Sequence, residues 1–328
     1  MIHDLCAALY DFEEAPVRAA LDAAFAPDAV IHLCHPFGDL TGPALLYDHA
    51  FEPLFGAIPD LERRDWIVIE GETAQGGRWI GCGGYYTGLF DAPFLGIPAT
   101  GRQAHMRFHE FYRIEDARVV EMQAIWDIPE LMMQAGAWPM APSLGREWLT
   151  PSPATQDGLG PHSEDGAANL VVVQDMLIHM GRHPGEGGPE VMEMERFWHP
   201  RMSWYGPAGI GTGRGIDGFR RHHQIPFLAA MPDRGNYRDQ LDYHFFAQGS
   251  YVAVTGWPNM RQHLTHGGWM GIAPSGKQVE MRSLDFWRLE NGLIRENWVL
   301  VDLLDVYRQL GVDVFARMGE LVGGHHGT

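Results

Sequence analysis

The feature that most constrains the fold is an internal repeat. Residues 96–136 align without a gap with residues 271–311 at a constant offset of 175 residues, and 13 of these 41 positions are identical. Other positions carry close exchanges, such as Arg102 for Lys277 and Tyr112 for Trp287. Solenoid repeats have periods of about 20–50 residues, so a repeat at this distance indicates a duplicated whole domain. The sequence therefore predicts two copies of one fold.

The domain boundaries follow from length and local composition. A chain of 328 residues is long enough for about two domains of ordinary size. Between the copies, residues 137–165 are dense in proline, glycine and serine and have no apolar period, which is typical of a connecting segment. We predict a first domain at residues 1–139, a linker at 140–165 and a second domain at 166–322.

Both halves show the same order of expected elements. Each begins with amphipathic helices, continues with a short strand and another helix, and ends with antiparallel strands. The last two strands form a hairpin with the turn sequences IEDARV and LENGLI, of which Asn-Gly is a strong hairpin signal. This order predicts an α+β fold. The opening helices are expected at Ile2–Phe12 and Pro16–Phe25, and at Ala168–Met180 and Pro189–Trp198.

Composition limits the partners and the compartment. A formal net charge of −18 disfavours binding to nucleic acid or to an anionic membrane surface. The three cysteines, Cys6, Cys34 and Cys82, have no CxxC spacing, which favours a reducing compartment over a disulfide framework. The N-terminus lacks a basic, apolar leader, and no run of 18 apolar residues is present. A cytoplasmic protein is expected.

Alternation along the hairpin strands sorts the side chains into two faces. Each copy has one mixed aromatic and apolar face that carries a single carboxylate, Glu110 in the first copy and Asp285 in the second. A carboxylate on such a face is either paired or shifted in pKa. The opposite faces carry Arg107, His109 and Phe111 in the first copy, and Arg282, Leu284 and Phe286 in the second.

The repeated segments resemble the SnoaL-like polyketide cyclase family. The shared features are the loop FLGIPATG, matched by WMGIAPSG, then the hairpin EFYRIEDA, matched by DFWRLENG, and an E-x-W-x-x-x-D type of ending. The resemblance covers both copies, and it implies two nuclear transport factor 2-like cone-shaped α+β barrels in tandem. In such a barrel a curved antiparallel sheet wraps around helices and encloses one deep cavity.

The resemblance also implies a chemistry. Members of the family close polyketide rings by an aldol reaction without metal or organic cofactor, using a cavity aspartate as general acid and base near a histidine on the same strand. This chain departs from that pattern, because the aspartate position is Ala124 or Val299 and the histidine position is Met122 or Asn297. Asp127 and Asp302, three residues further on, are expected to cap or anchor the helix that follows.

Glu110 and Asp285 are therefore the remaining acid/base candidates, with Asp285 preferred. The alternative for each is an ion pair with a neighbouring arginine. His32, which we align with Trp204 on the first strand, is a third catalytic candidate, and its alternative is a hydrogen-bonded residue of the cavity rim. The residues expected to line the ligand cavities are Trp204, Tyr205, Trp287, Asn297 and Val299 in the second copy, and Tyr86, Tyr112, Met122 and Ala124 in the first.

No metal site and no cofactor are expected. The 17 histidines include no H-E-x-x-H spacing, and the chain has no strand-linked GxGxxG, Walker A or GxSxG motif. Together these observations predict a cofactor-independent enzyme that acts by proton transfer on a small apolar or aromatic, polyketide-like molecule. The second domain is expected to hold the active cavity.

Two alternatives stay open. One is a small-molecule-binding protein without turnover, and the other is an assembly module. In either case the two domains are expected to dock as an intrachain pseudo-dimer through the Arg107 and Arg282 faces, with further homo-oligomers possible. An enzyme should have a closed cavity with Asp285 or Glu110 exposed inside it. A binding protein should have a cavity whose polar groups are all paired, and an assembly module should have an interior filled by side chains.

Overall fold

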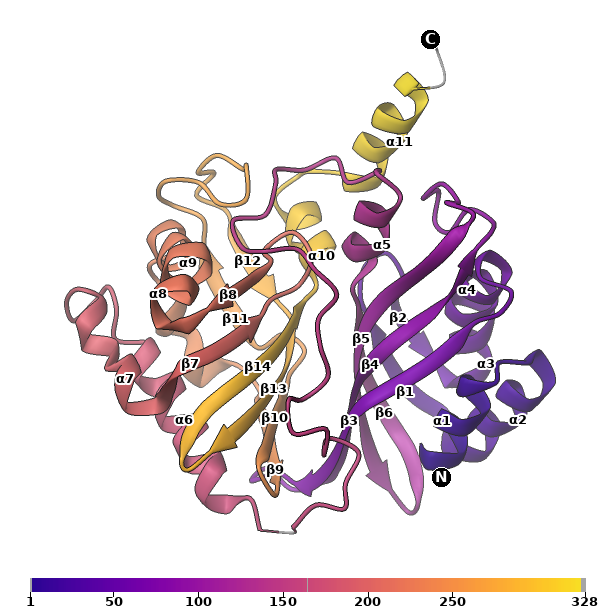
Figure 1. Cartoon of the computed structure of the whole chain (residues 1–328), viewed down its shortest axis with the longest axis horizontal. Coiled ribbons are helices and arrows are strands. Elements are labelled where there is room, and N and C mark those ends of the chain that lie inside the picture. Colours follow the sequence, from indigo (N-terminus) through magenta and orange to yellow (C-terminus); the bar gives the residue numbers. More distant parts are fainter. Residues whose placement is uncertain (1, 164, 326–328) are drawn as a thin grey trace.

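The computed structural model describes residues 2–163 and 165–325, and it contains two α+β units that follow each other along the chain (Figure 1). The first unit begins with two helices and ends with a hairpin and a short helix. Its elements are α1 (Ile2–Tyr10), α2 (Glu14–Ala24), β1 (Phe25–Leu33), β2 (Gly38–Thr41), α3 (Gly42–Leu46), η1 (Tyr47–Phe51), α4 (Glu52–Ala57), β3 (Glu62–Glu72), β4 (Arg78–Phe90), β5 (Arg102–Glu115), β6 (Arg118–Trp126) and α5 (Ile128–Gln134).

The second unit repeats this order with additional elements: the short helical turns η2 and η4, the short pair β11 and β12, and the terminal helix α11. Its elements are α6 (Ala167–Met180), η2 (Pro189–Met192), α7 (Met194–Phe197), β7 (Trp198–Tyr205), β8 (Thr212–Arg214), α8 (Gly215–Phe219), η3 (Arg220–Gln224), α9 (Ile225–Ala230), η4 (Arg234–Gln240), β9 (His244–Gln248), β10 (Tyr251–Thr255), β11 (Met260–His263), β12 (Gln278–Met281), β13 (Ser283–Glu290), β14 (Leu293–Val301), α10 (Leu303–Gln309) and α11 (Val314–His325).

The two six-stranded sheets have the same topology. The strand order is β2-β1-β6-β5-β4-β3 in the first unit and β8-β7-β14-β13-β10-β9 in the second. The α+β prediction is confirmed, with two differences of detail. Each sheet is curved but open, so that neither unit closes into a barrel, and the pairs β1–β6 and β7–β14 run parallel whereas the other pairs are antiparallel.

A π-helical turn recurs in both units, at η1 and at η3. In each case a proline follows directly, Pro53 or Pro226, at the start of the next helical segment. Because proline has no N–H to donate to the preceding turn, the regular helical ladder is interrupted there. The last residues of this turn line the space on the concave face of the sheet. In the second unit those residues are His223 and Gln224.

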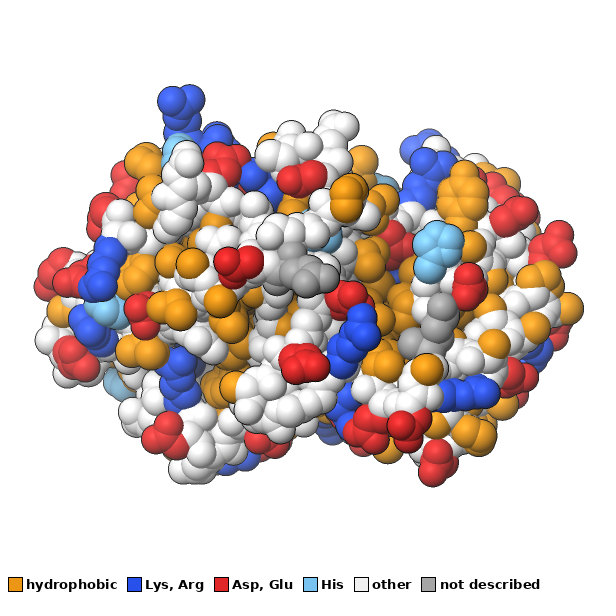
Figure 2. All heavy atoms as spheres, turned by 90° about the horizontal axis from the view of Figure 1, so that it is seen from below, with side chains coloured by type: hydrophobic (Ala, Val, Ile, Leu, Met, Phe, Trp, Pro, Cys, Tyr) orange, Lys and Arg blue, Asp and Glu red, His pale blue; other side chains and the backbone are white. Residues whose placement is uncertain are grey.

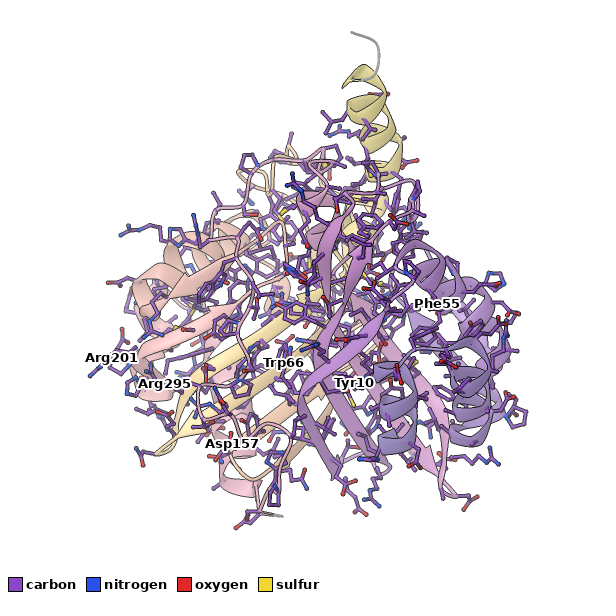
Figure 3. The ribbon with its side chains drawn as sticks, turned by 45° about the vertical axis from the view of Figure 1, so that its right-hand side comes forward. Tyr10, Phe55, Trp66, Asp157, Arg201 and Arg295 are labelled. Atoms are coloured by element: carbon purple, nitrogen blue, oxygen red, sulfur yellow. The ribbon has the colours of Figure 1, made fainter. Side chains whose placement is uncertain are left out.

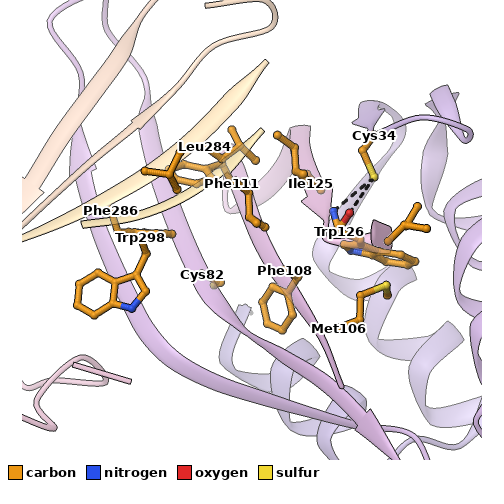
Figure 4. Packing of buried hydrophobic residues seen from close by; sticks show 14 of the residues in the cluster. Cys34, Cys82, Met106, Phe108, Phe111, Ile125, Trp126, Leu284, Phe286 and Trp298 are labelled. Carbon is orange, nitrogen blue, oxygen red and sulfur yellow. Dashed lines mark hydrogen bonds between the residues drawn. The ribbon is translucent and has the colours of Figure 1, made fainter. Parts of the chain in front are cut away.

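The two sheets pack against each other through their outer faces (Figure 4). Phe111 of β5 stacks on Phe286 of β13 with ring centroids 5.1 Å apart, and these two residues occupy equivalent positions of the repeat. The ring of His109 meets the edge of Phe286 at 5.0 Å, and its Nδ1 lies 2.6 Å from the carbonyl oxygen of Leu284. A contact between equivalent residues is what a twofold interface requires.

Small residues let the sheets approach. A Cβ atom added to Gly81 of β4 would lie 3.0 Å from the Phe286 ring, and one added to Gly83 would lie 3.2 Å from it. At the edge of the interface the rings of Trp66 and Trp298 lie 5.6 Å apart, and Figure 3 places Trp66 where the two halves meet. The glycines of β4 are therefore needed for packing against the other unit.

Arg107 extends this contact with hydrogen bonds. Its guanidinium donates to the carbonyl oxygens of Gly206 at 2.6 Å, Val299 at 3.2 Å and Tyr205 at 3.3 Å, all in the second unit. The guanidinium is almost completely buried. Several polar partners are what a buried charge requires, so Arg107 fixes the register between the units.

A reciprocal pair of aspartates joins the two units near the helices α5 and α10. Asp127 accepts a hydrogen bond from the backbone N–H of Ala208 at 2.9 Å, and Asp302 accepts one from the backbone N–H of His35 at 3.1 Å. Asp302 also accepts from the N–H of Asp305 and so caps α10, as expected, whereas the side chain of Asp127 makes no such cap bond. Asp127 therefore anchors the other unit instead of its own helix.

The segment between α5 and α6 is a packed spacer, and Figure 1 shows it running between the two sheets. Gly145 and Arg146 bond to Ile210 and Thr212 beside β8, and Gly158 accepts from the N–H of Val68 on β3. Both contacts lie along edge strands, whose free N–H and C=O groups would otherwise be open to pairing with another chain. The segment thus covers one edge of each sheet.

The acidic side chains are dispersed over one face of the molecule. Figure 2 shows one face on which acidic and basic side chains are interspersed over both halves with apolar side chains between them. The helix α11 projects away from the rest, but Val314 and Met318 on it are buried. Across the described residues, no helix combines the length and the apolar character needed to cross a membrane.

The central stacking contact gives the first prediction. Replacing Phe286 by alanine should lower the free energy of unfolding by about 3–5 kcal/mol, because a fully buried aromatic ring is lost and the cavity left behind lies between two sheets. Urea unfolding measures the change. The control is Val30→Ala, since Val30 is 44% exposed and should cost less than about 0.5 kcal/mol. A cost for Phe286→Ala as small as that of the control would show that the interface does not hold the units together.

Candidate functional site

The second unit contains a cavity between the concave face of its sheet and the helices α6, α8 and α9. An inner chamber of about 70 Å³ and an outer chamber of about 240 Å³ share several lining residues, among them Arg234, Ser283, Asp285 and Trp287. The inner walls are mostly apolar and aromatic. They include Trp198, Trp204, Phe219, Phe227, Trp269, Met281, Asn297 and Val299.

Asp285 stands at the junction of the two chambers. It lies on β13 directly opposite Val299 of β14 in the antiparallel register. Residues that face each other in this way have Cβ atoms about 4.5–5.5 Å apart and share one face of the sheet. Its side chain is only partly covered, because it borders the space of both chambers. Asp285 therefore combines deep placement with access for a small molecule.

A break in the long hairpin fixes this position. Where β4 and β5 of the first unit are continuous, the second unit divides the same hairpin into β10 and β11 and into β12 and β13. Asn259 bridges the break: its amide donates to the carbonyl of Ser283 at 2.7 Å, and its side-chain oxygen accepts from the Ser283 N–H at 2.9 Å. The Ser283 hydroxyl then donates to Asp285 at 2.9 Å. The bend thus sets the orientation of the carboxylate.

The surroundings leave Asp285 without a close counter-charge. Burial raises the pKa of its carboxyl to about 7, against opposing effects of the Ser283 hydroxyl and the Arg234 charge. Arg234 also lines both chambers, yet it forms no ion pair with Asp285 within 4 Å. A carboxyl with a pKa near neutrality can exist in both protonation states at physiological pH, as a group that exchanges protons must.

Several buried donors and acceptors around the inner chamber lack a partner in the described part of the chain. They include the indole nitrogens of Trp198 and Trp287 and the Nδ1 atom of His223. His223 stacks on Trp204 with centroids 4.1 Å apart, and burial, aided by the Arg234 charge, lowers its pKa to about 3, so that it is neutral at physiological pH. Buried polar atoms are normally satisfied, so unpartnered donors and acceptors in the residues of this wall are an unusual feature.

The equivalent carboxylate of the first unit, Glu110, has the opposite environment. It is completely buried and forms an ion pair with Arg63. Tyr86, Tyr112 and Trp126 also donate to it, at 2.9, 2.5 and 2.9 Å. Burial alone would raise the pKa of Glu110, but the Arg63 charge and these hydrogen bonds hold it below its usual value. In the second unit Tyr112 and Trp126 are replaced by Trp287 and Val301, which do not donate to Asp285.

The interior of the first unit is filled around Glu110. Phe51 occupies the place of Gln224 in the repeated π-helical turn. Its ring centroid lies 5.5 Å from that of Trp126 and 6.0 Å from that of Tyr86. Tyr86 in turn packs on Phe108 at 4.7 Å. All four side chains are fully or almost fully buried. The aromatic residues therefore occupy the volume that stays open in the second unit.

One group of potential metal ligands lies in the first unit outside this interior. The ligand atoms of Cys6, Asp65 and Cys82 lie within 4.8 Å of one another. Both oxygens of Asp65 accept hydrogen bonds from Arg63 at 2.9–3.1 Å, and the Cys6 thiol together with burial raises the pKa of Cys82. A carboxylate committed to a guanidinium and a thiol that resists ionisation are poor ligands.

Comparison with known proteins agrees with this architecture. The family model for SnoaL-like polyketide cyclases matches residues 4–135 and again residues 189–310. The chain belongs to the SnoaL-like polyketide cyclase family. Its two matched segments correspond to the two units, so this member of the family carries the fold in tandem. No curated protein matches the sequence.

Three of the solved structures similar to this chain each match about two fifths of it. IdmH from Streptomyces antibioticus is 23% identical with a TM-score of 0.35, and the match covers 41% of this chain and 95% of IdmH. AclR from Streptomyces galilaeus is 18% identical with a TM-score of 0.34 over 41% of this chain and 92% of AclR. A SnoaL-like protein from Jannaschia sp. CCS1 is 22% identical with a TM-score of 0.34 over 40% and 86%.

The predicted site residues of this SnoaL-like protein fall into separate groups. Trp204, Trp287, Asn297 and Val299 line the cavity with Asp285. Tyr205 lies on the other face of its strand, where its hydroxyl donates to Glu296 at 3.2 Å. The first-unit residues are all buried around Glu110 in the filled interior, and they are Tyr86, Tyr112, Met122 and Ala124.

The alignment of His32 with Trp204 is wrong by one residue. In the parallel registers His32 pairs with Gln123, whereas Trp204 pairs with Asn297, whose equivalent is Met122. A shift of one residue moves a side chain to the opposite face of the sheet. His32 accordingly points away from the interior, with Nδ1 2.7 Å from Asp39 and its ring 5.9 Å from Trp257 of the second unit. It is a hydrogen-bonded residue on the outer face of the sheet.

Sequence reasoning missed Arg234, His223, Gln224 and Trp198 in the cavity wall. The pairing of a π-helical turn with a following proline could have indicated His223 and Gln224, because the motifs HAFEP and HHQIP recur at the same place in both units. Arg234 lies in η4, which the first unit lacks, so the repeat contains no signal for it.

The contrast between the two carboxylates gives the second prediction. Because folding raises the pKa of Asp285 from about 4 to about 7, the folded protein holds this proton more tightly than the unfolded chain between those pH values. Wild-type stability should therefore fall relative to Asp285→Asn as pH rises from 4 to 7, and the difference should stay at a few kcal/mol above pH 7. Urea unfolding at several pH values measures it.

Glu110→Gln is the matched comparison and should behave in the opposite way. Its carboxylate is stabilised in the folded protein, so its contribution is present above the pKa of the unfolded chain and lost in acid. Removing this charge leaves Arg63 buried without its partner and should cost about 3–5 kcal/mol at neutral pH. Equal pH profiles for the two variants would contradict the assigned environments.

Proposed function

We propose that the second unit is a cofactor-independent enzyme in which Asp285 transfers a proton on a small, largely aromatic or apolar molecule. The observation that carries this proposal is the position of Asp285: an unpaired carboxylate at the junction of two chambers. It lies directly across the sheet from Val299, the place where the family resemblance puts its catalytic aspartate. The carboxylate has thus moved to the neighbouring strand while keeping the same face of the sheet.

The chemistry follows from the pKa and the surroundings. Ionised Asp285 can take a proton from a carbon next to a carbonyl group, and the resulting carboxylic acid can return it to another atom of the same molecule. Burial supports both steps, because a base with a pKa near 7 is ionised in part at neutral pH and still basic enough to accept a proton. Isomerisation, dehydration and aldol ring closure all begin with this step.

The cavity selects the shape of the molecule. Its aromatic walls suit a flat ring system, and the unpartnered indole nitrogens of Trp198 and Trp287 can donate to carbonyl or hydroxyl oxygens on that ring. The Nδ1 atom of His223 has no partner either, and the neutral imidazole adds a polar point without adding charge. A polyketide-like molecule with several oxygens along a ring edge fits this arrangement.

In this proposal the first unit is structural. Its carboxylate is neutralised by Arg63 and its interior is occupied by aromatic side chains, so neither a free base nor room for a ligand is provided there. Its role is to cover the outer face of the second sheet through Phe111 and Arg107.

A second candidate function, ligand binding without turnover, has one observation in its favour. The Asn297 amide, at the place of the family histidine, donates to the backbone oxygen of Phe286 at 3.0 Å and so is committed to the sheet. Neither position of the family's catalytic pair, Val299 or Asn297, then carries a titratable side chain in this unit. The experiment below separates the two candidates.

The third prediction concerns proton transfer itself. When aromatic β-dicarbonyl compounds are incubated with the protein in D₂O, NMR should show loss of the α-proton signal, with a rate that rises as pH passes about 7 and Asp285 ionises. Asp285→Asn should slow this exchange by about 10²–10⁴-fold, since general base catalysis contributes that much. Binding of the same compounds, followed by tryptophan fluorescence, should persist.

Glu290→Gln is the control for this experiment, because Glu290 is on the same strand but lies at its exposed end, paired with Arg288 and Arg295. Its exchange rate should equal that of the wild type. If the wild-type protein binds these compounds tightly and Asp285→Asn does not alter the exchange rate, the result favours a binding protein over an enzyme.

A further inference from the structure

The outer chamber is rich in arginine in a protein that is strongly acidic overall. Arg182, Arg234 and Arg238 line it, whereas its carboxylates are Glu186 and Asp285. The whole chain has 24 basic and 42 acidic residues, so the local balance is the reverse of the average. A cluster of cationic side chains in one cavity produces a local positive potential, which attracts an anion.

These three arginines differ from the others near them in having no counter-ion. Among the described residues, no carboxylate lies within 4 Å of the guanidinium of Arg182, Arg234 or Arg238, whereas Arg261 and Arg282 nearby are paired with Glu280 and Asp302. Arg234 has only the sulfur of Met260 as an acceptor, at 3.5 Å from its Nε atom, and the ring of Phe227 at 5.8 Å. A half-buried guanidinium without an acceptor oxygen is incompletely satisfied.

The backbone holds Arg234 in place. Asp233, the preceding residue, accepts from the backbone N–H of His263 at 2.9 Å, and its other oxygen lies 2.6 Å from the His263 ring nitrogen. This pair attaches the start of η4 to β11. Arg234 therefore extends from a fixed turn. Burial lowers the pKa of its guanidinium, and the charges of Tyr243 and Asp285 oppose this shift.

The first unit shows what a closed version of this site is like. There Arg63 reaches the interior from β3 and forms an ion pair with the carboxylate of Glu110. In the second unit the arginine comes from η4, stands at the mouth of the cavity and leaves the carboxylate of Asp285 unpaired. Arg234 and Asp285 are therefore not paired with each other, and Arg234 lies on the outer side of the site.

We propose that the outer chamber is an anion subsite, and that the ligand of the second unit is an aromatic or apolar molecule with one negatively charged oxygen group, a carboxylate or an ionised enol. Its apolar body occupies the inner chamber between Trp198 and Trp204, and its anionic group lies among Arg182, Arg234 and Arg238. The proposal rests on the assignment of this cavity as the ligand site in the proposed function, but not on turnover.

Asp285 sets the pH dependence of this binding. Asp285 faces the same space as the arginines, together with Glu186, Tyr243 and neutral His223. Among these groups, Asp285 is the one whose charge changes near neutral pH. The ionised carboxylate repels an anion, so affinity for the anionic ligand falls as pH rises through about 7. Asp285→Asn removes this fall.

The fourth prediction uses a matched pair of probes, 2-naphthoate and its neutral carboxamide, with binding followed by quenching of the cavity tryptophans and by calorimetry. The wild-type protein should bind the acid about tenfold to a hundredfold more tightly than the amide, the range for a hydrogen bond to a charged group, and added salt should reduce the preference. Arg234→Met and Arg238→Met should each remove most of this preference, so that the ratio of the two affinities approaches one.

Arg201→Met is the control, since Arg201 is an exposed arginine of the same unit that does not line either chamber, as its position in Figure 3 illustrates. It should keep the full preference. Equal affinity for acid and amide, or a preference that survives loss of Arg234 and Arg238, would overturn the anion subsite. Neither result depends on proton exchange, so the subsite and the catalytic role of Asp285 are tested separately.

Discussion

The stacking of Phe111 on Phe286 is the contact on which the rest of the molecule depends. The two residues are equivalent in the repeat, so the same position of each sheet contributes to the contact between the units. Gly81 and Gly83 allow the rings to lie this close, and Arg107 fixes the alignment through three backbone oxygens of the other unit. Because this contact uses the outer face of each sheet, the alternation of side chains leaves the concave faces for the two interiors.

The two interiors start from one plan and differ in how a carboxylate is satisfied. Glu110 and Asp285 lie opposite Ala124 and Val299 in the same register. Glu110 has an arginine and three further donors, and its pKa is low. Asp285 has one hydroxyl donor, and its pKa is raised to about 7. The difference comes from a few neighbours, chiefly the loss of donors at Trp287 and Val301 and the change of the arginine from β3 to η4.

Much of this could be predicted from the sequence, for reasons that particular residues make clear. The repeat and the Asn291-Gly292 hairpin located the long strands, and alternation put Glu110 and Asp285 on the inner face. The fate of each carboxylate could not be predicted, because Arg63 reaches Glu110 from 47 residues away and no local pattern encodes that contact. His32 was misplaced because the parallel register of its strand contains an irregularity between Phe25 and Val30. Arg234 was missed because the turn η4 is present in the second copy alone, so the first copy offers no equivalent residue for comparison.

A covalent tandem changes what the second interior can tolerate. An unpaired carboxylate, three uncompensated arginines and unsatisfied indole nitrogens all cost folding free energy. In a homodimer of identical units that cost would occur twice across one shared interface. Here the first unit carries a fully paired ion cluster and a filled aromatic interior, and it buries the outer face of the second sheet through Phe111, His109 and Arg107. The stability of the first unit thus offsets the polar, open interior of the second, while the two copies keep the same strand order and meet through equivalent residues.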